Sequence, residues 1–377
     1  MNEIFNFYEN KIKKVQVIYK NLIYEKTLFK GFSFAHCSSI TEIRNINDNQ
    51  NQDSISNQLM AVWYSGKAEE SKNQSIFASF FNYEIQSDMK INCNWLKPFL
   101  LSKSTKFPEG NPVIWKDFQT NNLFLFYAIM QTENLLKKAF GRGWFYCKLF
   151  YKISKDNGKT WSNSKILKDE LGYMIRNKPI RLKSKKDRIL LPMYKEVPPE
   201  SLIAISGDNG ESFHFSELIK DHEKYPKKRG LMGGSGNTQP TIVELENGVI
   251  LALMRTRLHK KIFRSISEDY GETWIRAEEI NLPNPDSGID MIKTSNNKLL
   301  LVFNNTTRGR NKLSIAISDE NLETKDVGKN WKVIGDLEYE PKKEFSYPCI
   351  IEDQNGLIHI TYTYKRKTIK HVILNLN

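Results

Sequence analysis

Residues 154–161, SKDNGKTW, carry a pattern that recurs as SGDNGESF at residues 206–213 and as SEDYGETW at residues 267–274. A decayed fourth copy begins at Ser318, with Trp331 after an insertion. Each full copy follows an apolar run, and its Asp and Gly predict a hairpin turn that brings the aromatic residue back onto the sheet. A repeat of roughly 50–60 residues in a strand-rich chain is typical of β-propeller blades.

The aspartates of the repeat, Asp156, Asp208 and Asp269, could hold the turns or act on a substrate. A repeated element usually supports a fold, whereas a catalytic residue normally occurs once in a chain. We therefore interpret these three aspartates as structural.

Most other apolar segments also predict strands of four to eight residues. They lie at residues 59–64, 123–127, 189–194, 249–254, 299–303 and 357–362. Many are rich in β-branched or aromatic residues and follow Asn-containing turns. Helical periodicity is found only at residues 1–9 and 132–140. An all-β chain of 377 residues accommodates six blades of about 55 residues. We expect an N-terminal segment at 1–29 and a single six-bladed β-propeller at 30–377.

The composition favours an acidic partner. The chain has 56 Lys and Arg against 43 Asp and Glu, a net charge of +13, which suits nucleic acid, anionic lipid or acidic sugars. No nucleic-acid-binding motif or basic and aromatic stripe is present, so nucleic acid is not the expected partner. The four cysteines lie far apart, and neither a disulfide, a metal site nor a cofactor is expected. Without a secretory signal or an 18-residue apolar run, we expect a cytoplasmic protein, with peripheral association at the inner membrane as an alternative.

Several motifs occur together in a particular order. They are FAH at 34–36, GKAE at 66–69, GNPV at 110–113, RNKPI at 176–180, QP at 239–240, LMRTR at 253–257, LPNPDSGID at 282–290, GRNKL at 309–313, YP at 347–348 and HITYTYKR at 359–366. With them the chain resembles the sialidase-like Asp-box (BNR repeat) superfamily over about residues 30–375. More narrowly, it is similar to a bacterial branch of Kdo hydrolases and exo-sialidases. The resemblance implies the sialidase fold and the removal of a terminal acidic sugar.

Sialic acid and Kdo are 2-keto-3-deoxy sugars with a carboxylate on the anomeric carbon, and bidentate arginines suit that carboxylate. By motif position, Arg255 resembles the second arginine of sialidases and Arg310 the third. His36 stands where the first is expected, and Lys178 is the candidate for the missing charge. A surface salt bridge for Arg255 and a structural role for His36 are the alternatives. The other candidate substrate contacts are Asn177, Gln239 and Asp290; Asp290 could also cap a turn, as could Asp286.

Tyr347 matches the nucleophilic tyrosine of the family, with core packing as the alternative. A neutral phenol avoids the repulsion that a carboxylate nucleophile would meet from the substrate's own carboxylate. Glu69, next to Glu70, is the candidate general acid. The assisting glutamate that the resemblance implies is absent, because its place reads NTQP at residues 237–240, and Glu196 is the substitute candidate.

These expectations describe an exo-glycoside hydrolase that releases a terminal 2-keto-3-deoxy acid sugar with retention. The sugar is Kdo from lipopolysaccharide or a lipid A precursor, or a sialic acid. The expected partner is an acidic glycan or glycolipid, with a membrane protein as a further alternative. A propeller that binds acidic carbohydrate without hydrolysis is the competing hypothesis.

Overall fold

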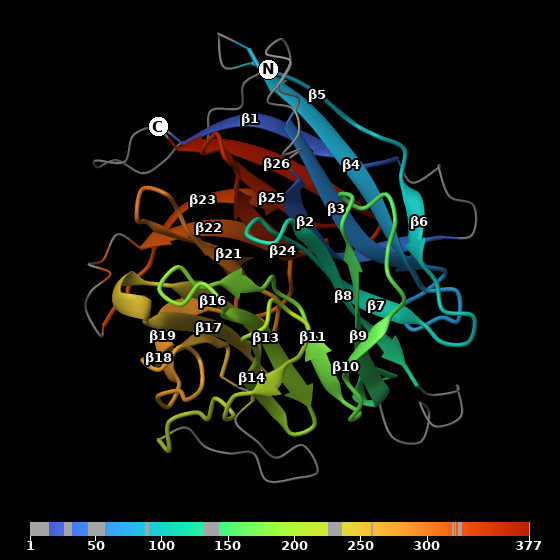
Figure 1. Cartoon of the computed structure of the whole chain (residues 1–377). Coiled ribbons are helices and arrows are strands. Elements are labelled where there is room, and N and C mark those ends of the chain that lie inside the picture. The colour runs from blue at the N-terminus through green and yellow to red at the C-terminus, as the bar shows by residue number, and fades with distance from the viewer. Residues whose placement is uncertain are drawn as a thin grey trace.

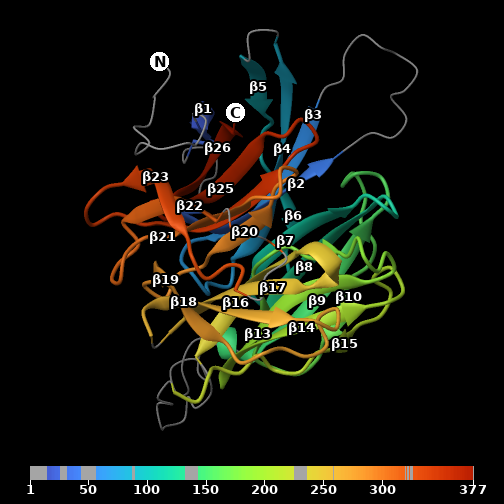
Figure 2. The same ribbon diagram turned by 90° about the vertical axis from the view of Figure 1, so that its left-hand side faces the viewer.

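The structure is a computed structural model of the chain that describes residues 15–25, 32–43, 57–86, 90–131, 143–224, 236–257, 259–318, 320, 322 and 326–376. The described strands form six antiparallel sheets of four or five strands, arranged around a common axis as a six-bladed β-propeller (Figure 1). The predicted fold is therefore confirmed. Figure 2, turned by 90°, shows the blade of residues 290–339 between the blade of residues 237–283 and the last strands of the chain, within residues 358–376.

The blades follow one another along the chain. Blade 1 consists of β2 (Phe34–Ile43), β3 (Asn57–Gly66), β4 (Ser75–Ile85), β5 (Ile91–Trp95) and β6 (Phe99–Ser102). Blade 2 consists of β7 (Glu109–Asp117), β8 (Asn122–Met130), β9 (Cys147–Ser154) and β10 (Lys165–Lys168). Blade 3 consists of β11 (Tyr173–Ile175), β12 (Ile180–Arg181), β13 (Ile189–Glu196), β14 (Pro199–Ser206) and β15 (His214–Phe215).

Blade 4 consists of β16 (Asn237–Glu244), β17 (Ile250–Thr256), β18 (Lys261–Ser267) and β19 (Glu278–Pro283). Blade 5 consists of β20 (Asp290–Lys293), β21 (Leu299–Asn304), β22 (Lys312–Ser318) and β23 (Lys332–Tyr339). Blade 6 consists of β24 (Phe345–Glu352), β25 (Ile358–Tyr364), β26 (Thr368–Leu376) and β1 (Val15–Leu22). The described residues also contain two 3-10 turns, η3 (Gly143–Tyr146) and η4 (Glu246–Gly248). The two predicted helical segments, residues 1–9 and 132–140, lie outside the described residues.

The ring closes through the N-terminal strand. β1 pairs with β26 from Val15 opposite Leu376 to Leu22 opposite Lys370. Residues 15–22 are therefore a strand of blade 6, whereas the sequence boundary placed all of residues 1–29 outside the propeller. No motif marks this strand, and its partner lies at the far end of the chain.

The repeated turns have the hydrogen bonds of a structural element. In the first copy the Asp156 carboxylate accepts from the Ser154 hydroxyl at 2.8 Å and from the Thr160 amide at 2.8 Å. Asp208 and Asp269 make the matching contacts in the next two copies. In the fourth copy Glu320 accepts from Ser318 at 3.2 Å, so a glutamate replaces the aspartate. These contacts support the structural interpretation of the repeated aspartates.

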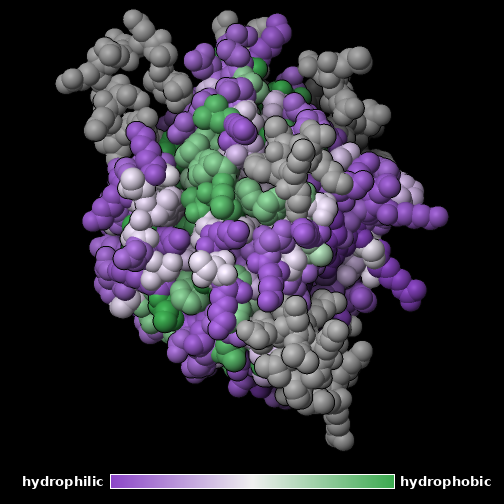
Figure 3. All heavy atoms as spheres, turned by 90° about the vertical axis from the view of Figure 1, so that its right-hand side faces the viewer, coloured by the Kyte–Doolittle hydropathy of each residue, from purple (hydrophilic) through white to green (hydrophobic). Residues whose placement is uncertain are grey.

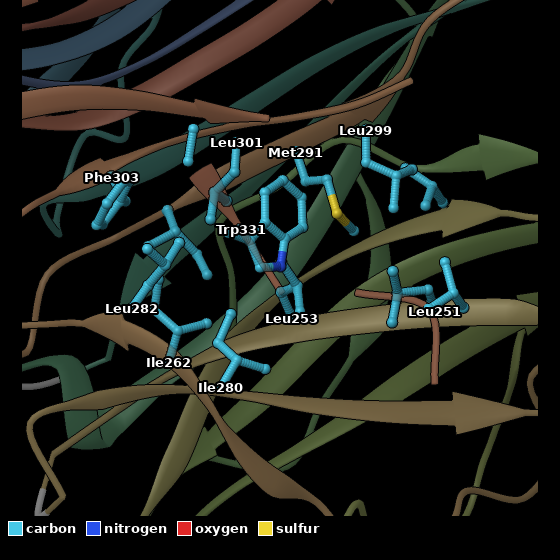
Figure 4. Close-up of a cluster of buried hydrophobic side chains, with 14 of the residues drawn as sticks. Leu251, Leu253, Ile262, Ile280, Leu282, Met291, Leu299, Leu301, Phe303 and Trp331 are labelled. Atoms are coloured by element: carbon cyan, nitrogen blue, oxygen red, sulfur yellow. The ribbon is translucent and has the colours of Figure 1, made fainter. Parts of the chain in front are cut away.

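The hydrophobic core lies between neighbouring blades. Trp331 of the fourth copy is 5% exposed and packs among leucines and isoleucines of blades 4 and 5 (Figure 4). Its indole N–H donates to the Gly328 carbonyl at 2.9 Å. Trp161 makes the same contact with Gly158 at 3.2 Å but is only half-buried. The aromatic residue of the repeat thus ties each turn to the core, most completely in blade 5.

We expect Trp331→Ala to lower the free energy of unfolding by about 3–5 kcal/mol, because it empties a fully buried indole site. Trp161→Ala should cost less, since part of that ring is already in solvent. Chemical denaturation of the two variants beside the wild type measures both values. Equal losses would contradict the assignment of Trp331 to the core.

Candidate active site

The first strands of four blades share a register shift near their N-terminal ends, and this shift positions the site. β2, β7, β16 and β24 each shift register near their first residues, which marks a β-bulge. Each bulge holds one residue other than glycine with a positive φ: Cys37, Asn111, Gln239 and Tyr347, at 57°, 47°, 55° and 54°. Bulges redirect side chains and are frequent beside active sites. Asn111, Gln239 and Tyr347 line one cavity on the propeller axis.

The cavity has a volume of about 410 Å³ and is rich in charge. Its lining residues are His36, Tyr64, Glu69, Asn111, Trp144, Phe145, Tyr194, Glu196, Gln239, Arg255, Arg257, Asp286, Arg310, Tyr347 and Arg366. Four arginines and three carboxylates thus face the same space. This composition suits a ligand that carries both an anionic group and hydroxyls.

Tyr347 lies among cations. Its hydroxyl accepts a hydrogen bond from Arg255 Nη1 at 3.0 Å. The Arg310 guanidinium lies 5.2 Å from the centre of its ring and that of Arg176 5.3 Å. Gly288 leaves room for this arrangement, because a Cβ there would come within 3.2 Å of the Tyr347 ring. Tyr347, Arg255 and Arg310, which the sequence placed together by order alone, are neighbours in space.

A network of ion pairs connects two arginines of the cavity lining with Glu69. Glu344 Oε1 lies 3.3 Å from Arg310 Nη1 and 3.5 Å from Arg366 Nη1. Arg366 Nη2 lies 2.6 Å from Glu69 Oε2, and the Tyr64 hydroxyl donates to Glu69 Oε1 at 3.0 Å. The arginines are therefore held in place by carboxylates before any ligand enters.

The choice between Glu69 and Glu70 depends on their partners. Glu69 lines the cavity, whereas both carboxylate oxygens of Glu70 accept from the amide of Gly143 at 3.1 Å. Glu70 thereby anchors η3, which carries Trp144 to the cavity wall. Only Glu69 is placed to meet a ligand in the cavity.

Elsewhere in the cavity lining, Glu196 forms an ion pair with Arg257, and its side chain is 8% exposed. Gln239 Nε2 donates to the Tyr194 hydroxyl at 3.0 Å. Gln239 Oε1 is buried and has no hydrogen-bond partner among the described residues. A buried amide oxygen without a partner provides an acceptor for a ligand or a water molecule.

His36 does not supply the missing cation. It is 2% exposed, and Nδ1 lies 2.9 Å from the Thr363 hydroxyl. Burial, together with the positive charges of Arg366 and Arg310, holds the pKa of His36 well below its usual value. Its ring is neutral at pH 7 and packs 4.4 Å from the ring of Tyr347, centre to centre.

Three predicted contacts lie outside the cavity. Lys178 Nζ is 2.7 Å from the fully buried Asp290 Oδ2, so its charge is already paired. Asn177 donates to the Pro240 carbonyl at 2.9 Å. Lys178 lines a second hollow, of about 800 Å³, near the C-terminal ends of β16, β20 and β24. Lys178, Asn177 and Asp290 therefore hold the blades together instead of lining the cavity.

We expect Lys178→Ala to lower the free energy of unfolding by about 3 kcal/mol, because it leaves the Asp290 carboxylate buried without its cation. If Lys178 only bound substrate, its substitution would raise KM and leave the stability of the fold intact. Thermal unfolding and steady-state kinetics of the variant separate these outcomes.

Three further arginines lie around Tyr347: Arg176, Arg257 and Arg366. Arg366 and Arg257 line the cavity, and both close motifs quoted above, HITYTYKR and LMRTR. Arg176 is 1% exposed and donates to the Pro348 carbonyl at 2.6 Å, behind the Tyr347 ring. An arginine in each motif was the available sequence signal for these residues. Which of these arginines reach the cavity depends on how the six blades close into a ring.

Glu109 is a buried carboxyl just before the bulge in β7. It is 2% exposed, and burial raises its pKa to about 7, with the Ser102 hydroxyl and Lys152 opposing that rise. Because the folded state binds this proton more tightly than the unfolded chain, stability is full at low pH and falls as pH rises toward 7. Glu109→Gln should therefore match the wild type near pH 4.5 and exceed it by up to about 3 kcal/mol above pH 7. Denaturation curves across this range test it, and a pH-independent difference would contradict it.

Among the described residues, no group of three or more His, Cys, Asp or Glu side chains is placed to bind a metal ion. The described helical segments include none long and apolar enough to cross a membrane.

Comparison with known proteins places these features in context. A family model described as a BNR repeat-like domain matches residues 57–360. Comparison with curated protein sequences gives no match.

Solved structures share the fold at low identity. A Dyadobacter fermentans protein of unknown function has a TM-score of 0.71 at 15% identity, covering 96% of this chain and 99% of its own. The NanB sialidase of Streptococcus pneumoniae gives 0.68 at 15%, covering 98% and 71%. The intramolecular trans-sialidase of Ruminococcus gnavus, solved with oseltamivir carboxylate, gives 0.68 at 16%, covering 94% and 96%.

Proposed function

The chain belongs to the BNR repeat-like domain family, and we propose that it is an exo-glycoside hydrolase that releases a terminal 2-keto-3-deoxy acid sugar. The main support is the placement of Tyr347, Arg255, Arg310 and Glu69 in one cavity. A nucleophile, cations for a carboxylate and a carboxylic acid are the groups that such a reaction requires. The sialidase and the intramolecular trans-sialidase that share this fold also support the proposal.

In the proposed mechanism Arg255 and Arg310 bind the substrate carboxylate through bidentate hydrogen bonds. Arg366 is the third cation, in place of the predicted Lys178. Tyr347 attacks the anomeric carbon and gives its phenol proton to a carboxylate of the cavity. Glu69, which must leave its ion pair with Arg366 and carry a proton for this step, protonates the leaving glycosidic oxygen. Water then cleaves the tyrosyl glycoside, and the two displacements give retention.

The attack requires an acceptor for the phenol proton of Tyr347. Glu196 is the acceptor predicted from the sequence, and it forms an ion pair with Arg257 that it must leave to take the proton. Asp286 also lines the cavity, with Oδ1 3.4 Å from Arg255 Nε. Comparing Glu196→Gln with Asp286→Asn identifies the acceptor, because loss of the true one should lower kcat and shift the pH–rate profile.

Kdo is the sugar we propose first and sialic acid second. Kdo is attached to a lipid-linked glycan, and the net charge of +13 favours an anionic surface. The test is the release of free keto acid from Kdo-lipid A and, in parallel, from sialyl-lactose. Release from neither substrate would remove this proposal. A membrane-protein partner remains a prediction, which co-purification from membranes would test.

A binding propeller without hydrolysis is the second candidate. It is motivated by two departures from the family pattern: the first arginine is missing, and the assisting glutamate is absent from residues 237–240. The same assay separates the two, because a binding protein would retain the acidic glycan without releasing keto acid.

A further inference from the structure

Residues 90–107, KINCNWLKPFLLSKSTKF, form a strip that the proposed function does not use. It contains four lysines and no acidic residue. The strip includes β5 and β6, which pair with β4 at the outer edge of blade 1. Figure 3 shows this side of the molecule, where hydrophobic residues gather at the surface between hydrophilic ones.

Two large apolar side chains of the strip are in solvent. Leu96 is 40% exposed and Leu100 50%. Leu96 is fixed in position, because its amide donates to the Phe80 carbonyl at 2.8 Å and its carbonyl accepts from the Ser79 hydroxyl at 2.6 Å. Phe99 stacks on Phe80, with ring centres 5.7 Å apart, and this contact holds β6 against β4. Leu100 pairs with Phe77 and so lies on the other face of this edge strand. The backbone that carries both leucines is therefore held in place.

The lysines of the strip flank these leucines along the sequence. Lys97, Lys103 and Lys106 are exposed, and none has a carboxylate partner among the described residues. The outer strand of the next blade differs, because Lys165 pairs with Glu211 and Lys168 with Glu170. Lysines alone could serve to protect a sheet edge from pairing with another chain. That role does not explain two exposed leucines beside them.

We propose that the strip at residues 90–107 docks onto a bilayer surface rich in anionic lipid. Apolar side chains that enter the interface and lysines that reach anionic headgroups are the two contributions to peripheral membrane binding. The strip leads directly into β7, whose Asn111 lines the cavity. Docking would thus hold the cavity near a lipid surface. This proposal does not rest on the proposed hydrolysis, since binding is measured without turnover.

The test is co-sedimentation of the full chain with vesicles of phosphatidylcholine alone or with 40 mol% phosphatidylglycerol, roughly the charge density of an anionic leaflet. We expect binding to the mixed vesicles only, with loss of binding as salt is raised. The triple change Lys97→Gln, Lys103→Gln and Lys106→Gln should weaken binding roughly 100-fold, since each lysine contributes about fivefold. Leu96→Ser with Leu100→Ser should weaken it roughly 10–30-fold.

Matched controls change exposed residues elsewhere. Replacing Lys155, Lys159 and Lys332 with Gln lowers net charge equally, and Ile275→Ser with Tyr339→Ser removes apolar surface of similar exposure. Both controls should bind like the wild type. Equal weakening by the lysine control would overturn the proposal in favour of net charge alone. Absence of binding, or equal binding to neutral vesicles, would also overturn it. Unfolding curves confirm that every variant is folded.

Discussion

Tyr347→Phe should reduce turnover on the order of 10⁴-fold while the propeller stays folded. The substitution keeps the ring that packs against His36 and Arg310 and removes only the hydroxyl, which closes the covalent route. The lost hydrogen bond from Arg255 should cost about 1 kcal/mol of stability. Arg255 Nη1, the donor that loses the hydroxyl, keeps its contact with the Asp286 carbonyl at 3.5 Å, so it is not left without any partner.

Two measurements on the wild type complete this test. A 2,3-difluoro keto-acid sugar should trap an adduct on Tyr347, which peptide mass spectrometry would locate. NMR of the released sugar should show retention at the anomeric carbon. Tyr339→Phe is the control, because Tyr339 is 65% exposed on β23 and should remain fully active. Inversion without an adduct would assign the attack to water activated by a carboxylate.

Arg310→Lys should lower kcat/KM by about 10–100-fold, with little change in the melting temperature. Lysine retains the charge but loses the planar fork that binds both oxygens of a carboxylate. The side chain is 24% exposed, so its replacement strands no buried charge. Arg255→Lys should be at least as damaging, because that guanidinium also contacts the Tyr347 hydroxyl.

The control for both variants is Arg276→Lys. Arg276 is 45% exposed and pairs with Glu223 at the surface. If Arg310→Lys and Arg255→Lys keep wild-type kinetics, the substrate carboxylate is bound elsewhere and Arg366 and Arg257 become the candidates.

Local chemistry explains why much of the fold could be predicted from the sequence. In the three full copies of the repeated turn the aspartate contacts residues no more than four positions away, so a short motif contains the whole interaction. The strands likewise follow from apolar runs bounded by turn residues. Tyr347, Arg255 and Arg310 were placed together through the order of motifs, and the structure brings them into one cavity.

Interactions between distant parts of the chain could not be predicted from short sequence motifs. The repeat, the all-β class, the six blades and the motifs that carry a tyrosine and arginines could all be predicted from the sequence. The pairing of Lys178 with Asp290, the place of Arg366 in the cavity and the closure of the ring by β1 against β26 are seen only in the folded chain. Each depends on residues more than a hundred positions apart, which meet when the ring closes. His36 is neutral for the same reason, because burial among arginines from other blades lowers its pKa.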